Sequence, residues 1–204
     1  MIGLRLGVVI LAAGTGSRFG GGKLLALLDD RPLLQHVVDA CADWGPAALI
    51  VVLGADADVA ERIVGWGDAL RVRNPAPEQG LASSLRIGLA AAAAVEPPLD
   101  GVFIALGDQP RVRTGTFRIL GRAAAAEAAA GVDAHPIVVP RYTGEPAGVA
   151  NPALLLRAAW PLVERLEGDR GMGPVIAANP SLVLPVPIEG ANPDVDTPDD
   201  LRRL

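Results

Sequence analysis

The stretch Ile10–Lys23 reads ILAAGTGSRFGGGK, in which five glycines and two cations follow directly on a run of aliphatic residues. The run itself, LGVVILA at 6–12, is continuous and rich in β-branched residues, which is typical of a parallel strand covered on both faces. Glycine-rich bends after such strands can bind phosphate, because backbone N–H groups become accessible and no side chain intervenes. The stretch therefore predicts a buried strand that leads into a phosphate-binding loop.

Two common phosphate loops do not fit the spacing of this stretch. A P-loop requires GxxxxGK followed by Ser or Thr, but the residue five before Gly22 is Ser17, and Leu24 follows Lys23. A dinucleotide fingerprint requires GxGxxG, but Phe19 stands where the third glycine belongs. The sequence therefore excludes a P-loop and argues against hydride transfer with a dinucleotide.

The residues of the stretch still suit a nucleotide. The small residues at 12–14 would let a base or ribose lie against the bare backbone, where larger side chains would collide. Backbone N–H groups at 16–19 would face a polyphosphate, and Arg18 and Lys23 would neutralise its charge. The alternative is a glycine-rich turn that carries two solvated cations.

Composition excludes several classes of protein. Of the 204 residues 50% are hydrophobic and 20% are charged, which indicates a folded domain and not a disordered chain. The net charge of −5, without a basic run, argues against a nucleic-acid partner. Cys41 is the single cysteine, so no internal disulfide and no CxxC metal pair can form. It lies at helical spacing from other apolar residues, and we expect it to be a buried core residue.

The beginning of the sequence resembles a secretory leader in outline only. Arg5 is followed by the apolar run LGVVILAA, but that run ends in GTGSRFGGGK without a small-x-small cleavage site. The run is also far shorter than the roughly 20 apolar residues that span a membrane. We therefore expect a cytoplasmic protein without a membrane segment.

Short aliphatic runs alternate with helical patterns along the whole sequence. Strands are predicted at 6–12, 47–54, 70–74, 101–107, 136–140 and 182–188. Helices are predicted at 33–41, 57–66, 83–94, 116–130 and 151–166, the last kinked or restarted at Pro161. Such alternation predicts an α/β fold with three layers and a mainly parallel sheet. Because no repeat and no long linker interrupts it, residues 1–204 are expected to form a single domain.

The glycine-rich stretch resembles the signature of a known family. LAAGTGSRFGGGK at 11–23 is similar to the LAAGxSxRMGxxK motif of molybdenum cofactor cytidylyltransferases. These enzymes group with the molybdopterin guanylyltransferases among the MobA-like nucleotide transferases. Four later segments match the family in order and spacing: GLASSLRIG at 80–88, LGDQP at 106–110, GDRG at 168–171 and DVDTPDDL at 194–201. The resemblance implies a Rossmann-like nucleotide transferase fold.

The same resemblance implies a reaction. In such enzymes a nucleophilic phosphate attacks the α-phosphate of a nucleoside triphosphate and pyrophosphate leaves, so positioning and charge neutralisation dominate catalysis. The resemblance implies three catalytic residues: Arg18 and Lys23 at the β- and γ-phosphates, and Asp108. It further implies Mg²⁺ held by Asp108 and Asp196, with Asp194 as the rival for the second position.

The resemblance also implies a set of nucleotide-binding residues. They are Leu11, Ala12, Ala13, Gly14, Gly16, Arg18, Lys23, Gly80, Ser83 and Ser84, with Arg86 as a further candidate. Structural alternatives exist, because Ser83 and Ser84 could cap the following helix and an Asp before Pro often forms a turn. DTPDD at 196–200 is likewise a good helix start with Thr197 as the cap. His36 and His135 receive no catalytic role.

One departure from the family concerns the acceptor. The pterin-side segment usually reads GxRGHPV or GxRGNPV, and here GEPAGVANPALL at 144–155 keeps Asn151 and Pro152 but lacks the preceding Arg-Gly. That arginine would be a natural partner for an anionic acceptor, so the acceptor stays open. LAAG favours cytidine, since guanylyl relatives typically have LAGG there. The implied function is Mg²⁺-dependent transfer of CMP from CTP to the phosphate of a molybdopterin-type cofactor.

Other functions compete with this one. The same fold could use GTP, or a different acceptor such as a sugar phosphate. A non-catalytic protein that binds a nucleotide or cofactor and delivers it is the alternative from another class. The family's role also implies a transient complex with a molybdoenzyme or its chaperone.

Overall fold

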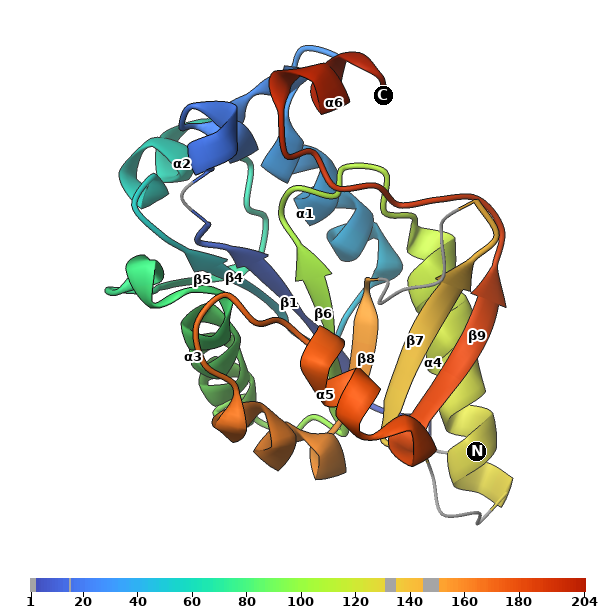
Figure 1. Cartoon of the computed structure of the whole chain (residues 1–204). Helices are drawn as coiled ribbons and strands as arrows, with labels where there is room; N and C mark the ends of the chain where they lie inside the picture. The colour runs from blue at the N-terminus through green and yellow to red at the C-terminus, as the bar shows by residue number, and fades with distance from the viewer. Residues whose placement is uncertain (1–2, 15, 131–134, 145–150) are drawn as a thin grey trace.

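A computed structural model gives the fold, and it describes residues 3–14, 16–130, 135–144 and 151–204. The strands of the main sheet are β1 (Leu6–Ala12), β4 (Leu49–Leu53), β5 (Leu70–Arg73), β6 (Gly101–Leu106), β7 (Ile137–Tyr142), β8 (Ala153–Leu156) and β9 (Val183–Ile188). They form one seven-stranded sheet in the order β5–β4–β1–β6–β8–β7–β9 (Figure 1). Strand β8 runs antiparallel to β6 and β7, and the remaining neighbours pair in parallel. The predicted mainly parallel sheet is confirmed.

Helices cover both faces of this sheet (Figure 1). One face carries α1 (Leu33–Trp44), α2 (Ala57–Ile63) and α4 (Thr114–Ala130), and the other carries α3 (Leu81–Ala93), the 3-10 helix η4 (Arg157–Arg165) and α5 (Gly173–Ala178). The smaller elements are η1 (Ser17–Phe19), η2 (Lys23–Leu25), β2 (Leu27–Leu28), β3 (Arg31–Pro32), η3 (Pro77–Gln79), η5 (Pro180–Leu182) and α6 (Pro198–Arg202). The predicted three-layer α/β architecture is therefore confirmed. Within the described ranges no helix has the length and apolarity that a membrane span requires.

Strand β1 shows why the sequence around it is continuously apolar. All seven of its residues are buried. Val8 and Ile10 join the core beneath α1 and α4, whereas Val9 and Leu11 join the core beneath α3. A strand covered on both faces needs no polar alternation, which is the pattern that predicts it. Cys41 lies in the α1 core as expected, and burial raises the pKa of its thiol.

The prediction of a helix at 151–166 is wrong for 153–156 and met in part at 157–165, which form the 3-10 helix η4 with Pro161 inside it. Residues 153–156 form β8, which inserts between β6 and β7 and pairs Leu154 with Phe103 on one side and Val138 on the other. The chain then continues as 3-10 turns through Pro161. Leucine and alanine favour a helix locally, but the gap in the sheet offers this segment two ladders of backbone hydrogen bonds and buries Ala153, Leu154 and Leu155.

The order of the strands locates the ligand-binding edge of the sheet. From β1 the chain moves outward to β4 and β5, and then returns to β6 on the opposite side of β1. In open α/β sheets, ligands bind at such a switch point, beyond the carboxyl ends of the strands. The glycine-rich loop follows β1 and the LGDQP turn follows β6, so both reach this edge. The C-terminal segment with α6 passes over the same edge (Figure 1).

Candidate active site

The glycines of the first loop fold it back on itself. Gly16, Gly20, Gly21 and Gly22 have φ values of 59°, 92°, 96° and 63°, a region that favours glycine. A Cβ atom on Gly16 would lie 3.0 Å from the Cβ of Lys23, so the lysine packs directly over the bend. The N–H of Phe19 donates to the Gly16 carbonyl at 2.9 Å. This N–H, which was expected to face a polyphosphate, is therefore engaged within the loop.

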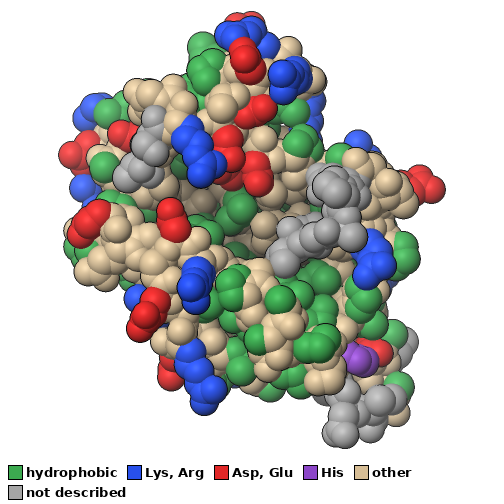
Figure 2. Space-filling view, viewed as in Figure 1, with side chains coloured by type: hydrophobic (Ala, Val, Ile, Leu, Met, Phe, Trp, Pro, Cys, Tyr) green, Lys and Arg blue, Asp and Glu red, His purple; other side chains and the backbone are tan. Residues whose placement is uncertain are grey.

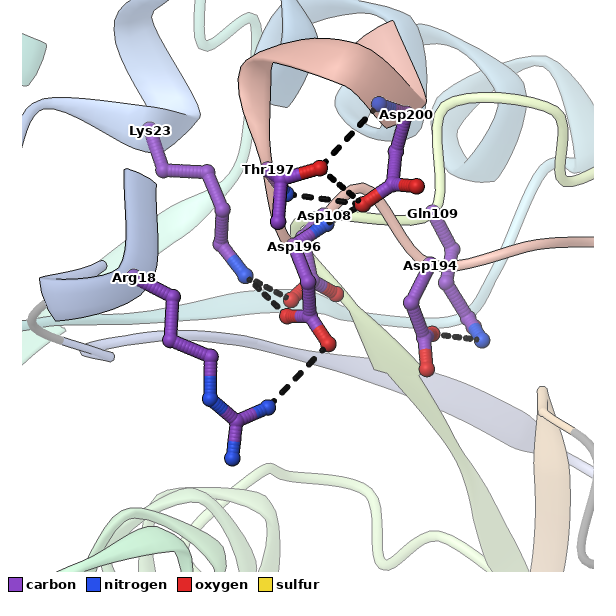
Figure 3. Close-up of polar contacts among 8 residues, drawn as sticks. All are labelled: Arg18, Lys23, Asp108, Gln109, Asp194, Asp196, Thr197 and Asp200. Carbon is purple, nitrogen blue, oxygen red and sulfur yellow. Dashed lines mark hydrogen bonds and ion pairs between the residues drawn. The ribbon is translucent and has the colours of Figure 1, made fainter. Parts of the chain in front are cut away.

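Lys23 brings two carboxylates together at the edge of the sheet. Its Nζ donates to Asp108 Oδ2 at 2.6 Å and to Asp196 Oδ1 at 3.1 Å (Figure 3). The side chains of Lys23 and Asp108 are only 10% and 21% exposed, so the charge-assisted bond between them is largely shielded from water, whereas Asp196 is 45% exposed. Arg18 approaches the same cluster from solvent, with Nη1 3.6 Å from Asp196 Oδ2 and a side chain 80% exposed. Residues 85 and 173 positions apart from Lys23 thus meet at one ammonium.

Each carboxylate is held by its own turn. Asp108 lies two residues beyond β6, and its carbonyl accepts the Val195 N–H at 3.0 Å, which ties the C-terminal segment to the turn. Asp196 precedes α6, where Thr197 and Asp200 form a reciprocal capping box. The helix start predicted at DTPDD is thereby confirmed. The cap also orients the site, because the Asp196 N–H donates to Asp200 Oδ2 at 3.2 Å.

The electrostatics of the cluster favour a charged lysine. Burial works to lower the pKa of Lys23, but the charges and hydrogen bonds of Asp108 and Asp196 outweigh it, and the pKa lies above its ordinary value. Asp194 behaves differently. Its Oδ1 accepts from Gln109 Nε2 at 2.6 Å beside the cluster (Figure 3). Burial, and then the charge of Asp108, raise the pKa of Asp194. The geometry therefore groups Asp196, and not Asp194, with Asp108 on the lysine.

A cavity of about 470 Å³ opens beside this cluster. It is lined by Ala13, Gly14, Gly16, Arg18, Lys23, Pro77, Glu78, Gln79, Gly80, Leu81, Ser84, Gly168, Asp169 and Asp196. Figure 2 shows acidic and basic side chains gathered around a hollow in this face of the molecule. The cations belong to the loop after β1, whereas the facing wall comes from η3, the start of α3 and the turn at 168–169. Arg18 and Lys23 thus lie in one part of the cavity lining together with Asp196, and the facing wall carries the exposed acidic residues Glu78 and Asp169.

Asn74 fixes the two serines at the start of α3. Its Nδ2 donates to Ser83 Oγ at 2.8 Å and to Ser84 Oγ at 2.9 Å, and its Oδ1 accepts from the Ala76 N–H at 2.9 Å. Neither serine caps the helix, since Gly80 occupies the N-cap and no side chain bonds there. Both serines are buried, but Ser84 borders the cavity, whereas Ser83 is not part of the lining and donates to the Gly80 carbonyl. Ser83 therefore supports the wall from behind.

The two carboxylates fit a divalent cation that arrives with a nucleotide. Among the described residues, no group of three or more His, Cys, Asp or Glu side chains is arranged to hold a metal ion. However, Asp108 Oδ1 is buried without a hydrogen-bond partner, and Asp108 and Asp196 converge on one positive charge. Mg²⁺ is usually bound by one or two carboxylates together with substrate phosphate oxygens and water. Two carboxylates beside a nucleotide-sized cavity meet this requirement.

Comparison with known proteins identifies the family. The profile of the MobA-like NTP transferase domain matches residues 8–182, from β1 to the end of η5. The chain belongs to this family. Bifunctional protein GlmU of Burkholderia mallei (strain SAVP1) is 35% identical over 121 residues, which make up 58% of this chain and 26% of that protein. The chain thus spans about a quarter of the length of this curated relative.

Solved structures agree over a longer range. Rv0371c from Mycobacterium tuberculosis H37Rv superposes with a TM-score of 0.84 at 31% identity, over 100% of this chain and 98% of that chain. A structure of Rv0371c in complex with manganese gives a TM-score of 0.79 at 30% identity, over 98% and 97% of the two chains. The predicted Rossmann-like transferase fold is confirmed.

The structure of this NTP transferase domain gathers most of the predicted nucleotide-binding residues. Ala13, Gly14, Gly16, Arg18, Lys23, Gly80 and Ser84 line the cavity, and their roles stay predictions. Leu11 borders a separate cavity of about 170 Å³, and Ala12 is buried in the sheet core. Arg86 points elsewhere, because its Nη1 donates to the Leu166 carbonyl at 2.5 Å. Of the acceptor segment at 144–155, residues 145–150 lie outside the described residues.

Sequence reasoning missed several residues of the site. Pro77, Glu78, Gln79, Leu81, Gly168 and Asp169 also line the cavity. A signal existed for three of them, since Leu81 lies in GLASSLRIG and Gly168 and Asp169 lie in GDRG, which were matched as motifs, although no role was attached to these three residues. Asn74 also carried a signal, because it is the polar residue at the end of the strand predicted at 70–74. Nothing in the sequence indicates that Gln109 bonds Asp194, since the two residues lie 85 positions apart.

Proposed function

We propose that this chain is a metal-dependent nucleotidyltransferase that transfers CMP from CTP to the phosphate of a molybdopterin-type acceptor. The observation that carries this proposal is the meeting of Lys23, Asp108 and Asp196 at the mouth of a cavity walled by the glycine-rich loop. Cations at one side of such a cavity suit a triphosphate, and paired carboxylates suit a divalent cation. The family profile and the resemblance of LAAG to cytidylyl enzymes support the same conclusion.

In this proposal, two cations neutralise the phosphates and two carboxylates hold the metal. The Arg18 side chain is 80% exposed and would contact the outer phosphates from solvent, whereas the Lys23 side chain is 10% exposed and bonds Asp108 and Asp196. Both neutralise charge, which favours departure of pyrophosphate. Asp108 and Asp196 would hold the metal, Mg²⁺ or Mn²⁺, which when bound supplies charge neutralisation at the α-phosphate. The manganese complex of the relative Rv0371c supports a divalent cation.

The acceptor is the less constrained half of the proposal. The segment at 144–155 lacks the Arg-Gly that precedes Asn-Pro in the pterin-binding relatives. This departure favours a second candidate, the same CMP transfer to another phosphorylated acceptor such as a sugar phosphate. Transient delivery of the product to a molybdoenzyme or its chaperone is part of the first proposal alone.

Release of pyrophosphate tests the proposal directly. Purified chain, Mg²⁺ and CTP or GTP are combined with molybdopterin, with a sugar 1-phosphate, or with no acceptor. We expect pyrophosphate only with CTP and molybdopterin together. Pyrophosphate with the sugar phosphate alone would select the second candidate, and preference for GTP would overturn the cytidine assignment. Binding of CTP without pyrophosphate under any acceptor would indicate a carrier and not a transferase.

A further inference from the structure

The turn at 166–171 packs backbone against backbone on the start of α3. Gly80 has φ 86°, and a Cβ atom there would lie 2.4 Å from the carbonyl carbon of Gly168 and 2.6 Å from the N of Asp169. The Gly168 carbonyl accepts the Ala82 N–H at 3.1 Å. Gly171 closes the contact, since a Cβ there would lie 2.8 Å from Leu81 Cδ2. The turn therefore packs directly on the start of α3, and its residues Gly168 and Asp169 form part of the cavity wall.

Of the three charged residues in this turn, Asp169 is the one that lines the cavity. Its Oδ1 accepts the Leu81 N–H at 3.3 Å, so the first N–H groups of α3 are satisfied by the turn and are not offered to a ligand. The residue is exposed and lines the cavity. A carboxylate has about four acceptor sites in total, and one hydrogen bond leaves the others for a ligand that can donate.

Arg86, one helical turn further along α3, bonds the residue at which the same turn begins. Its Nη1 donates to the carbonyl of Leu166 at 2.5 Å, and Leu166 itself is 5% exposed in the core. Arg86 borders a groove between α3 and η4, and it is not among the residues that line the nucleotide cavity. Leu166 and Met172 anchor the two ends of the turn in the core, and the arginine fixes the carbonyl at which the turn begins.

We propose that Asp169 is a nucleoside-contacting residue and that Arg86 is a positioning residue that acts through the turn. The inference rests on the proposed function, because it requires a nucleotide in the cavity. Arg18 and Lys23 attract the phosphates to their side, and a carboxylate on the facing wall repels phosphate while accepting hydrogen bonds. The ligand groups that satisfy Asp169 are the donors of a nucleoside, namely a ribose hydroxyl or a base amino group.

Because Asp169 is negatively charged, an electrostatic role and a hydrogen-bonding role predict opposite changes in the affinity for CTP. Asp169→Asn removes a negative charge near an anionic ligand, so a purely electrostatic role would leave CTP binding unchanged or tighten it. A hydrogen-bonding role predicts the opposite, with CTP bound about 10-fold more weakly, the scale for a bond to a charged acceptor. Calorimetry with CTP and with inorganic tripolyphosphate separates the two, since tripolyphosphate has no nucleoside and should bind Asp169→Asn at least as well as wild type. Glu167→Gln is the matched control, because it makes the same charge change in the same turn outside the cavity lining.

Two nucleotide analogues identify the donor. If Asp169→Asn and wild type bind 2′-deoxy-CTP equally well, the hydrogen-bond partner of Asp169 is the ribose hydroxyl that this analogue lacks. If Asp169→Asn still binds 2′-deoxy-CTP more weakly than wild type does, but the two proteins bind UTP equally well, the partner is the amino group of the base. Unchanged or tighter CTP binding by Asp169→Asn would overturn the inference, as would an equal loss of CTP and tripolyphosphate. A wild-type chain that prefers GTP would contradict the cytidine proposal only, and the same comparison run with GTP would still decide about Asp169.

The role of Arg86 is tested by coupling. Arg86→Met should weaken CTP binding several-fold, and Arg86→Lys, which keeps one donor for the Leu166 carbonyl, should recover part of it. In the Asp169→Asn background, Arg86→Met should reduce the affinity for CTP little further, because the effects of two substitutions that act through the same contact are not additive. Fully multiplicative losses would show that Arg86 acts independently of Asp169. Arg165→Met is the control, since Arg165 is an exposed cation of the adjacent η4 that does not border the cavity.

Discussion

Removal of Lys23 should increase the affinity of the protein for a divalent cation when no nucleotide is present. The lysine ammonium donates to Asp108 Oδ2 and Asp196 Oδ1, the two carboxylates proposed to hold the metal. Without nucleotide, the ammonium and the cation therefore compete for the same oxygens. Lys23→Met keeps the length of the side chain but removes its charge, so it leaves both carboxylates available.

The magnitude follows from the two contacts that the cation must displace. Each is a hydrogen bond between charged groups, at 2.6 Å and 3.1 Å, and such bonds contribute about 1.5–3 kcal/mol. If water recovers about half of this when the ammonium is freed, about 1.5–3 kcal/mol opposes the cation in the wild type. Lys23→Met should then bind Mn²⁺ about 10- to 100-fold more tightly at pH 8.

Titration of Mn²⁺ followed by electron paramagnetic resonance measures this affinity directly. Arg18→Met is the control, because its ion pair with Asp196 is exposed and longer, and exposed pairs contribute at most about 1 kcal/mol. Lys23 is also the only lysine of the 204 residues, so lysine labelled with ¹⁵N gives one side-chain signal. That signal should shift when a diamagnetic cation, Mg²⁺, is added. Equal or weaker Mn²⁺ binding by a folded Lys23→Met would refute the competition.

Three further predictions concern the nucleotide and the charges around it. Lys23→Ala should weaken binding of CTP more than binding of CMP, because its expected partners are the β- and γ-phosphates; equal losses by calorimetry would make it a long-range charge only. CTP should bind more tightly than GTP by about 1–3 kcal/mol, because LAAG resembles the cytidylyl enzymes and a site that fits a pyrimidine has less room for a purine; equal affinities in the same calorimeter would remove the cytidine assignment. Asp194→Asn should raise the melting temperature at pH 8. The raised pKa of Asp194 means that the folded state binds its proton more tightly than the unfolded state, so wild-type stability is lost as the pH rises through that pKa. Asparagine does not titrate, so the gain should be small near pH 4 and grow above it, and a gain that is the same at both pH values would contradict this.

The sequence predicted the fold where local pattern and tertiary environment agree. β1 and β6 are continuous apolar runs because helices cover both of their faces. Burial on both faces of a strand produces such a run in any parallel sheet, so the run predicts the strand. The helix prediction failed at 153–156 because the leucines of this segment suit a helix as well as a strand. Only the hydrogen bonds that β6 and β7 offer decide between them, and these depend on residues about 15 to 55 positions away.

The candidate site was predictable in its cationic half. Arg18 and Lys23 follow β1 and Asp108 follows β6, so knowledge of a parallel sheet is enough to bring them to one edge. The facing wall could not be derived in this way. Asp169 reaches the cavity only because the turn at 166–171 lies on Gly80 in a contact that no side chain would allow. A close contact between two backbones requires glycine, but a glycine in the sequence does not show which other segment it contacts.

Pyrophosphate release by Asp108→Asn tests the central claim most directly. Asparagine keeps the size of the side chain and suits a turn, but it removes the charge that a divalent cation requires. With saturating CTP, Mg²⁺ and acceptor, we predict that turnover falls by about 100-fold or more, the scale for loss of a group that stabilises developing charge. The variant should still fold and bind CTP through the glycine-rich loop. Wild-type turnover in a folded Asp108→Asn protein would remove Asp108 from the chemistry and contradict the site proposed above.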